Sequence, residues 1–123
     1  MIVLIVDDSK LARMSIARLL DMLRPTWTKI EATNAVEAMA LQSEGGIDVA
    51  LLDFNMPGRD GLTLAAELRA VNPKMPMAII SANAQNEIVS RAKAIGAGFL
   101  PKPLTQQALA EFLDAVEHRL ETG

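Results

Sequence analysis

Short apolar runs alternate along the chain with longer stretches in which apolar residues recur every three or four positions. A continuous run of β-branched and leucine residues is typical of a strand buried on both faces, whereas the three-to-four spacing is typical of a helix with one buried face. A strand is followed by a helix, and this order repeats five times. The predicted strands cover residues 2–6, 27–32, 49–52, 77–80 and 98–101.

Two of these strands have the character of sheet edges. Residues 27–32 alternate in polarity and carry Lys29 and Glu31, and charged side chains are common on an edge strand. Residues 98–101 end in Pro101, which cannot donate a hydrogen bond to a neighbouring strand. We therefore expect both segments at the edges and the three other strands in the buried middle.

Polar caps and helix breakers delimit the predicted helices. Ser9 and Asn34 are suited to cap the first two helices, and Pro25 and Gly96 end the first and fourth. The apolar residues expected on the inner faces, helix by helix, are Ile16, Leu19, Leu20 and Leu23; Val36, Met39 and Ala40; Leu64, Leu68 and Val71; Ile88, Ala92 and Ile95; and Leu109, Phe112, Leu113, Val116 and Leu120. The acidic residues expected on a solvated face of the last helix are Glu111, Asp114, Glu117 and Glu121.

Five strand–helix repeats predict an α/β fold with a parallel sheet and helices on both faces. The chain contains no linker, internal repeat or low-complexity tract, so we expect one domain over residues 1–123. It ends a few residues past the last predicted helix, and no second domain is expected.

Composition narrows the classes of function. Half of the 123 residues are apolar, which is enough for one core, and the net charge of -3 comes from scattered basic and acidic residues without a basic stripe. We therefore expect no nucleic-acid partner. No run is long enough to span a membrane, the N-terminus lacks a basic leader, and cysteine is absent, all of which fit the cytoplasm. A single histidine, His118, argues against a histidine-built metal site or catalytic triad.

Polar residues stand directly after the predicted buried strands. Asp7 and Asp8 follow the first strand, Asp53 the third, Ser81 the fourth and Lys102 the fifth. The carboxyl ends of parallel strands lie at the same edge of a sheet, where α/β proteins bind their ligands. We therefore expect these side chains to meet at one rim.

Such a rim favours phosphoryl chemistry. Three neighbouring carboxylates repel one another, and a hard divalent cation such as Mg²⁺ relieves that repulsion. A carboxylate can attack a phosphoryl group and form an acyl phosphate. Lys102 and the cation can then neutralise the phosphoryl oxygens, to which Ser81 can donate a hydrogen bond. Asn55, two residues beyond Asp53, could offer its backbone carbonyl to the cation.

The chain resembles the receiver domain of bacterial two-component systems over its whole length. The matching motifs are Asp7-Asp8-Ser9, Asp53-Phe54-Asn55-Met56-Pro57-Gly58 with Asp60-Gly61, Ser81-Ala82 and Gly96-Ala97-Gly98-Phe99-Leu100-Pro101-Lys102-Pro103. Each motif is common by itself, but their order and their places at strand ends are specific. The resemblance implies a doubly wound, flavodoxin-like sheet of five parallel strands in the order 2-1-3-4-5.

The resemblance also implies roles at the rim. Asp53 is expected to be the phosphoacceptor. Asp8 is expected to be the main acidic ligand of Mg²⁺, with Mn²⁺ as an alternative, and Asp7 to contribute through a metal-bound water. Asp53 itself and the backbone carbonyl of Asn55 complete the expected ligands.

Four further residues receive roles by resemblance. Ser81 corresponds to the switch hydroxyl, and Lys102 to the family lysine, held by a peptide bond to Pro103 that is usually cis. Phe99 occupies the switch aromatic position, which is tyrosine in many relatives. Phenylalanine lacks the hydroxyl, so its inward and outward states would differ only by packing.

The expected function is a phosphorylation-dependent signalling switch and not an enzyme. A histidine kinase or phosphotransfer protein would donate the phosphoryl group, and the monomeric chain would signal to an unidentified protein through residues 84–95, 98–101 and 106–117. No membrane or nucleic-acid partner is expected. One alternative is an Mg²⁺-dependent phosphohydrolase acting through an aspartyl phosphate, disfavoured because Asn55 stands where an acid–base aspartate would be expected. Another is a receiver domain excised from a larger regulator.

The motifs also have simpler interpretations. Asp7 and Asp8 could be an acidic pair that is favourable at a helix N-terminus, Ser81 could cap a strand end, and Lys102 could be a solvated surface lysine. Taken one at a time, these interpretations would be preferred. The joint occurrence of the residues at one predicted rim favours the phosphoryl site.

Overall fold

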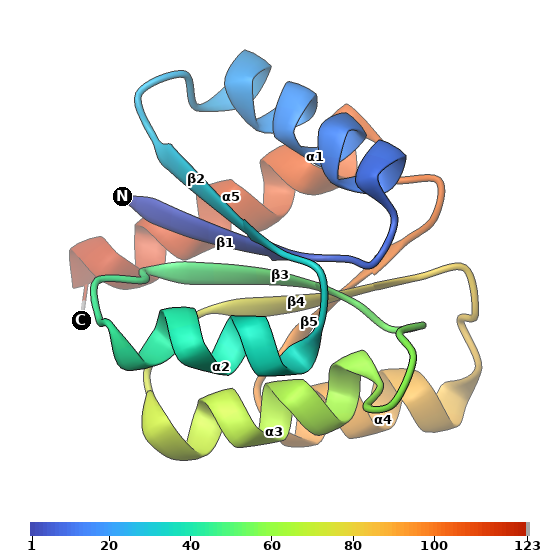
Figure 1. Cartoon of the computed structure of the whole chain (residues 1–123). Coiled ribbons are helices and arrows are strands. Elements are labelled where there is room, and N and C mark those ends of the chain that lie inside the picture. Colours follow the sequence, from blue (N-terminus) through green and yellow to red (C-terminus); the bar gives the residue numbers. More distant parts are fainter. Residues whose placement is uncertain (123) are drawn as a thin grey trace.

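The computed structural model describes residues 1–122, which form five strands and five helices in strict alternation (Figure 1). The strands are β1 Ile2–Val6, β2 Thr28–Ala32, β3 Val49–Asp53, β4 Met77–Ser81 and β5 Gly98–Pro101. The helices are α1 Lys10–Leu23, α2 Ala35–Ser43, α3 Gly61–Val71, α4 Asn86–Ala94 and α5 Gln106–Thr122. The predicted order of elements is confirmed, and each strand boundary lies within one residue of its predicted position.

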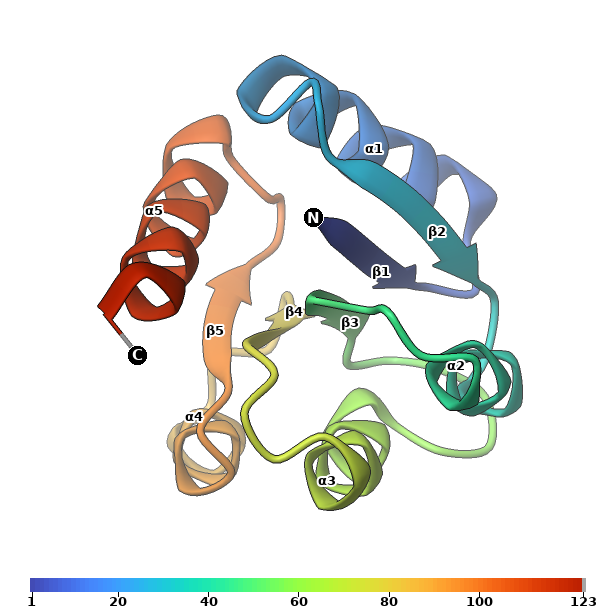
Figure 2. The same cartoon turned by 90° about the vertical axis from the view of Figure 1, so that its left-hand side faces the viewer.

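All strand pairs in the sheet are parallel, and the strand order is β2-β1-β3-β4-β5. The expected order 2-1-3-4-5 is therefore confirmed, and β2 and β5 are the two edges. Figure 2 shows α1 and α5 on one face of the sheet and α2, α3 and α4 on the other. This is the doubly wound arrangement that the sequence pattern predicts.

The core is divided into two layers by the sheet. In β1, Val3 and Ile5 pack under α1 and α5, while Leu4 and Val6 pack under α2, α3 and α4. Successive side chains of a strand point to opposite faces, so a continuous apolar run fills both layers at once. No helix within residues 1–122 is both long and apolar enough to cross a membrane.

The predicted caps of the first two helices are confirmed. The Ser9 hydroxyl accepts a hydrogen bond from the backbone N–H of Ala12 at 3.2 Å, and the Asn34 side chain accepts one from Glu37 at 2.8 Å. Each bond satisfies a donor that the first turn of a helix leaves without a partner inside the helix. Asp60 caps α3 in the same way, through the N–H of Thr63 at 2.8 Å.

Parts of the predicted inner faces are wrong. In α2 the buried residues are Ala35 and Ala38, whereas Val36 is 69% exposed and Ala40 is exposed as well. Small side chains let this short helix lie close to the sheet, while the apolar pattern favours its larger aliphatic residues. Val71, in the last turn of α3, is also exposed.

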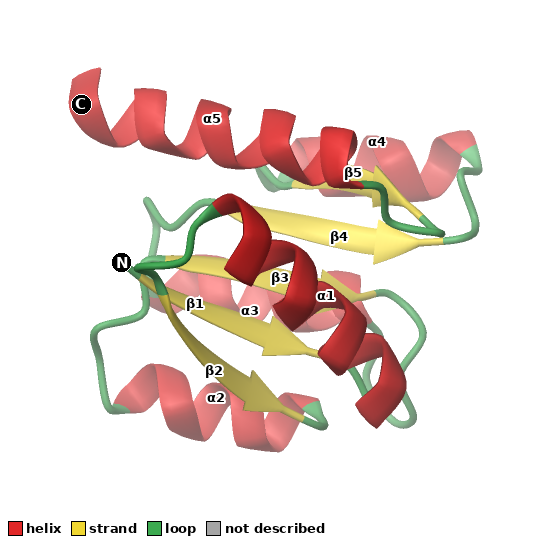
Figure 3. Ribbon diagram, turned by 90° about the horizontal axis from the view of Figure 1, so that it is seen from above, coloured by secondary structure: helices red, strands yellow, loops and turns green. Residues whose placement is uncertain are grey.

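Leu120 near the end of α5 is exposed too, contrary to the predicted inner face. A helix of 17 residues is about 25 Å long, whereas a strand of five residues spans about 17 Å. The C-terminal end of α5 therefore extends past the strands, as Figure 3 shows, which leaves Leu120 50% exposed.

The acidic face predicted for α5 is largely solvated, since Glu111 and Asp114 are exposed and Glu117 is half-buried. Arg24, which follows α1, donates hydrogen bonds to Asp114 and to Glu117, each at 2.6 Å, and its guanidinium carbon lies 5.7 Å from the ring centre of Trp27. These ion pairs join α1 to α5. The side chain of Glu121 lies outside the part of the chain that the structure describes.

Candidate functional site

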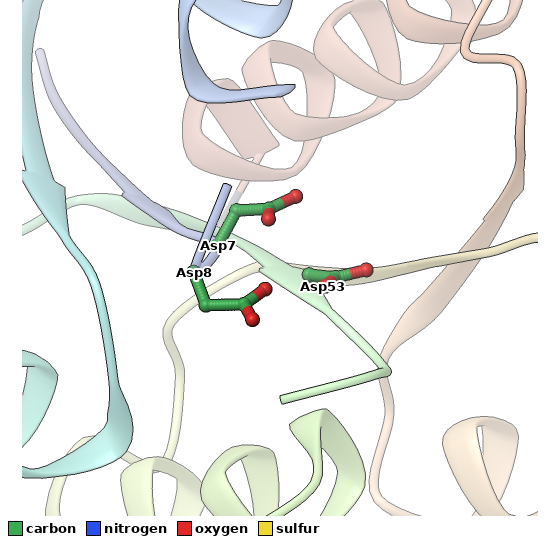
Figure 4. Close-up of side chains that lie close together, drawn as sticks. All are labelled: Asp7, Asp8 and Asp53. Atoms are coloured by element: carbon green, nitrogen blue, oxygen red, sulfur yellow. The ribbon is translucent and has the colours of Figure 1, made fainter. Parts of the chain in front are cut away.

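Three carboxylates lie together at the carboxyl end of the sheet. Asp7 and Asp8 lie in the loop after β1 and Asp53 is the last residue of β3, and one oxygen of each lies within 4.8 Å of the others (Figure 4). Asp7 and Asp53 are buried, with 1% and 3% of their surface exposed, whereas Asp8 is exposed. The cluster thus consists of two buried carboxylates and one that faces solvent.

Lys102, the residue after β5, reaches this cluster. Its Nζ donates a hydrogen bond to Oδ1 of Asp53 at 2.7 Å and lies 3.9 Å from Oδ2 of Asp7. The backbone N–H of Lys102 donates to the carbonyl of Ser81 at 3.0 Å. The peptide bond between Lys102 and Pro103 is cis, as the resemblance implies. Residues far apart in the sequence therefore meet at the expected rim.

Asp7 lies in an environment that disfavours its charge. Burial is the largest cause that raises its pKa above the ordinary value, and the charges of Asp53 and Asp8 raise it further. A hydrogen bond from the Ser9 N–H to its Oδ1, at 2.9 Å, and the charge of Lys102 act in the opposite direction. Among the described residues, the buried Oδ2 of Asp7 has no hydrogen-bond partner.

This arrangement fits a divalent cation with oxygen ligands. A buried carboxylate oxygen without a partner is energetically costly, and a cation beside it would supply the missing interaction. The cluster offers only oxygen atoms, which suits a hard cation such as Mg²⁺ rather than a metal that prefers nitrogen or sulfur. Asn55 lies in the exposed loop that follows β3, close in sequence to Asp53.

Ser81 completes the rim as the last residue of β4, and it is buried. Its hydroxyl oxygen accepts a hydrogen bond from the N–H of Asn83 at 3.0 Å, so the hydroxyl hydrogen is available for a different acceptor. The Asn83 side chain in turn accepts from the N–H of Gln85 at 3.1 Å. The hydroxyl is thereby tied to the loop that leads into α4.

Phe99 lies on the edge strand β5 and is half-buried against the core layer beneath α4. It also lines a hollow of about 400 Å³ along β5 and α5, together with Phe112 and Glu111. The aromatic ring is therefore not enclosed on every side. This hollow lies on the predicted signalling surface.

Gly61 matters to the site in a way that its place in a motif does not explain. A Cβ atom added to Gly61 would lie 2.3 Å from the carbonyl oxygen of Asp53, far inside contact distance. Its N–H donates to the carbonyl of Phe54 at 2.9 Å. The start of α3 thus packs directly on the backbone that carries Asp53. Glycine at the start of a helix, where its propensity is poor, is the sequence signal that could have revealed this contact.

Arg13 is a second residue that the sequence analysis did not identify. Its Nη1 donates to the backbone carbonyl of Asp7 at 2.7 Å, and its Nε donates to Glu31 on β2 at 2.9 Å. No sequence signal marks it, because its two partners are joined only by the fold. It contacts the acidic loop without belonging to the cluster.

The fold and the rim define a class of protein: a doubly wound α/β domain with an acidic cluster that could hold a cation and a lysine beside one buried aspartate. Comparison with known families identifies the particular one. The model of the response regulator receiver domain matches residues 3–114, and the chain belongs to that family. Receiver domains are signalling components of two-component systems, and phosphorylation on aspartate is typical of them.

The curated relatives are regulators of different lengths. The chain is 41% identical over 114 residues to the positive alginate biosynthesis regulatory protein of Pseudomonas aeruginosa, covering 90% of this chain and 45% of that protein. It is 35% identical to the chemotaxis protein CheY-3 of Vibrio cholerae, covering 96% of this chain and 92% of that one. The chain therefore spans about half of the first relative and nearly all of the second.

Solved structures of other proteins have the same fold as this chain. The chemotaxis protein CheY4 of Vibrio cholerae has a TM-score of 0.84 with 28% identity, covering 94% of this chain and 97% of that chain. A CheY-like receiver domain protein of Methanospirillum hungatei has a TM-score of 0.89 with 22% identity, covering 99% and 98%. The second similarity, at its low identity, concerns the fold alone.

Proposed function

We propose that this chain is a phosphorylation-dependent switch whose Asp53 accepts a phosphoryl group from a histidine kinase or a phosphotransfer protein. The observation that carries the proposal is the 2.7 Å hydrogen bond between Lys102 and Asp53 beside a carboxylate cluster suited to a cation. Receiver domains act with such donors and with downstream proteins.

The proposed transfer step uses the side chains of the rim. An ionised oxygen of Asp53 attacks phosphorus, a new O–P bond forms, and the bond from phosphorus to the donor nitrogen breaks, with its electron pair left on that nitrogen. Lys102 can move from the Asp53 carboxylate to an oxygen of the transferred group. Ser81 can donate its hydroxyl hydrogen to another, since its oxygen already accepts from Asn83.

The cation in this proposal is Mg²⁺, with Mn²⁺ as an alternative. Asp8, Asp53 and the backbone carbonyl of Asn55 would bind it directly, and Asp7 would hold a metal-bound water. When bound, the cation supplies positive charge that neutralises the carboxylates and the phosphoryl oxygens. The unpartnered Oδ2 of Asp7 supports this assignment, because a metal-bound water could donate to it.

The readout in this proposal is a change in the surface formed by α4, β5 and α5. Phosphorylation adds negative charge and three strong acceptors at Asp53, which would draw Ser81 and Lys102 towards the phosphoryl group. Movement of Ser81 would leave space for Phe99, whose ring already adjoins the hollow along β5 and α5. A protein partner that prefers this arrangement would shift the equilibrium further.

We further propose a single receiver domain over residues 1–123, a monomer, working in the cytoplasm. The nearly complete coverage of the chemotaxis protein supports a single-domain regulator. The alginate regulator, of which the chain spans 45%, supports the alternative of a receiver domain taken from a larger regulator.

Incubation with acetyl phosphate and Mg²⁺, followed by intact-mass measurement, tests the proposed chemistry. We expect one phosphoryl group per chain, removable by hydroxylamine as an acyl phosphate is, and absent from Asp53→Asn. Asp60→Asn is the matched control, because Asp60 lies in the connection that follows Asp53 and asparagine can also cap α3. Rapid turnover of many phosphate esters without a stable adduct would instead support the phosphohydrolase.

A further inference from the structure

One side chain connects the acidic loop to the edge strand of the sheet. Arg13 lies in the second turn of α1, and only 12% of its side-chain surface is exposed. Its guanidinium donates to the backbone carbonyl of Asp7 at 2.7 Å and to the carboxylate of Glu31 on β2 at 2.9 Å. The planar guanidinium can make both bonds at once because its donors diverge in a fixed geometry.

The backbone of Asp7 is thereby held on two sides. Its N–H donates to the carbonyl of Ala32 at 3.2 Å, and its carbonyl accepts from Arg13. That carbonyl belongs to the peptide group that joins Asp7 to Asp8, so the bond from Arg13 fixes the plane of this group. The direction in which Asp8 leaves the loop depends on the same plane.

We propose that Arg13, oriented by Glu31, is a positioning residue for the cation site, holding the Asp7–Asp8 peptide group so that both carboxylates converge with Asp53. This inference rests on the proposed function, since it assigns a role towards the proposed cation. The geometry gives the role to the hydrogen-bonding shape of arginine and not to its charge alone. Replacement of a residue that hydrogen-bonds to a metal ligand typically lowers the affinity for the metal about 10-fold or more.

A second ion pair on the same edge provides a matched comparison. Lys29 on β2 pairs with Asp21 on α1, so it also joins this strand to this helix. Asp21 lies two turns further along α1 than Arg13, away from the acidic loop. Loss of the Lys29–Asp21 pair should therefore affect the packing of α1 on β2 without affecting the cation.

The test is a titration of the full chain with Mg²⁺, in which the amide NMR shifts of residues 8–10 report binding. Unfolding by urea is measured in parallel. Arg13→Lys keeps the charge but cannot make both bonds, and we expect it to weaken Mg²⁺ binding about 10-fold. Glu31→Gln should weaken it in the same direction by a smaller factor. Asp21→Asn should change it less than about twofold, because exposed ion pairs contribute little.

The outcomes separate this inference from the function beneath it. The positioning role would be overturned if Arg13→Lys bound Mg²⁺ as tightly as the wild type. It would also be overturned if Glu31→Gln and Asp21→Asn weakened Mg²⁺ binding equally. Either result would leave the proposed switch intact. Failure of the wild-type chain to bind Mg²⁺ would remove the cation from the proposed function, and this inference with it. Folding of each variant is checked by its urea transition, and Glu31→Gln keeps the test decisive if Arg13→Lys does not fold.

Discussion

Lys102 and Asp53, 49 residues apart in the chain, are joined by a 2.7 Å hydrogen bond at the carboxyl rim of the sheet. Asp53 is buried, and the side chain of Lys102 is 33% exposed. A buried carboxylate thus has a charged donor that remains in contact with solvent. The same donor can follow charge that develops on a group bound to Asp53, which makes the pair suited to phosphoryl transfer.

Removal of the lysine should weaken the fold as well as the chemistry. In Lys102→Met the Asp53 carboxylate stays buried without its charged donor, so we expect the free energy of unfolding to fall by about 1–3 kcal/mol. Urea denaturation at pH 7 measures this loss. Lys74→Met, at an exposed position, is the control and should change little. An unchanged free energy of unfolding in Lys102→Met would show that the hydrogen bond to Asp53 does not stabilise the folded state.

Asp7 should make stability fall as the pH rises. Burial, and then Asp53 and Asp8, raise its pKa above the ordinary 3.8, so the folded protein holds this proton more tightly than the unfolded chain does. Between 3.8 and the raised value the unfolded chain loses the proton first, and above that window the ionised Asp7 destabilises the fold. Without Mg²⁺, Asp7→Asn should therefore have a higher free energy of unfolding than the wild type at pH 7.

The stability gained by Asp7→Asn should shrink as the pH falls towards 3.8, where wild-type Asp7 becomes protonated in the folded and the unfolded state alike. Urea transitions at a series of pH values measure it, and Asp60→Asn should show little gain at any pH. A gain that does not depend on pH, or a loss at pH 7, would contradict the assigned environment of Asp7.

Mg²⁺ should stabilise the chain through Asp8. A ligand that binds only the folded state raises its stability in proportion to the logarithm of ligand concentration over Kd, by about 2.7 kcal/mol at 100 times Kd. We expect the melting temperature to rise with millimolar Mg²⁺ in the wild type and to stay constant in Asp8→Asn. Glu44→Gln, at an exposed acid far along the chain, should keep the wild-type response. An equal response in Asp8→Asn would remove Asp8 from the ligands.

Gly61→Ala should be destabilising although alanine is the better helix former. The new Cβ would lie 2.3 Å from the carbonyl oxygen of Asp53, so β3 or α3 must shift. We expect a net loss of about 1–3 kcal/mol and impaired phosphorylation. Thr63→Ala, two residues further along α3 and exposed, should gain a few tenths of a kcal/mol from propensity alone. Similar stability in the two variants would contradict the close approach of α3 to Asp53.

Much of the fold and of the rim could be predicted because both depend on local patterns. The apolar run of β1 fills both core layers, and the residues at the carboxyl ends of β1, β3, β4 and β5 share one edge in any parallel sheet. The inner face of α2 could not be predicted in the same way, since alanine and valine are both apolar and only packing on the sheet distinguishes Ala38 from Val36.

The supporting contacts of the rim depend on tertiary structure alone. Arg13 meets the Asp7 carbonyl and Glu31 only because β2 lies beside β1, and Gly61 meets Asp53 only because α3 begins against the end of β3. Arg24 likewise pairs with Asp114 because α1 and α5 lie on the same face of the sheet. Spacing along the chain carries no signal for such contacts.

The most direct test of the central claim is to locate the phosphoryl group on the wild-type chain. After incubation with acetyl phosphate and Mg²⁺, borohydride reduces an aspartyl phosphate to homoserine, and peptide mass spectrometry then identifies the modified residue. The proposed switch predicts homoserine at position 53 alone. Modification at Asp7, Asp8 or Asp60 instead, or no modification while the chain binds Mg²⁺, would contradict it.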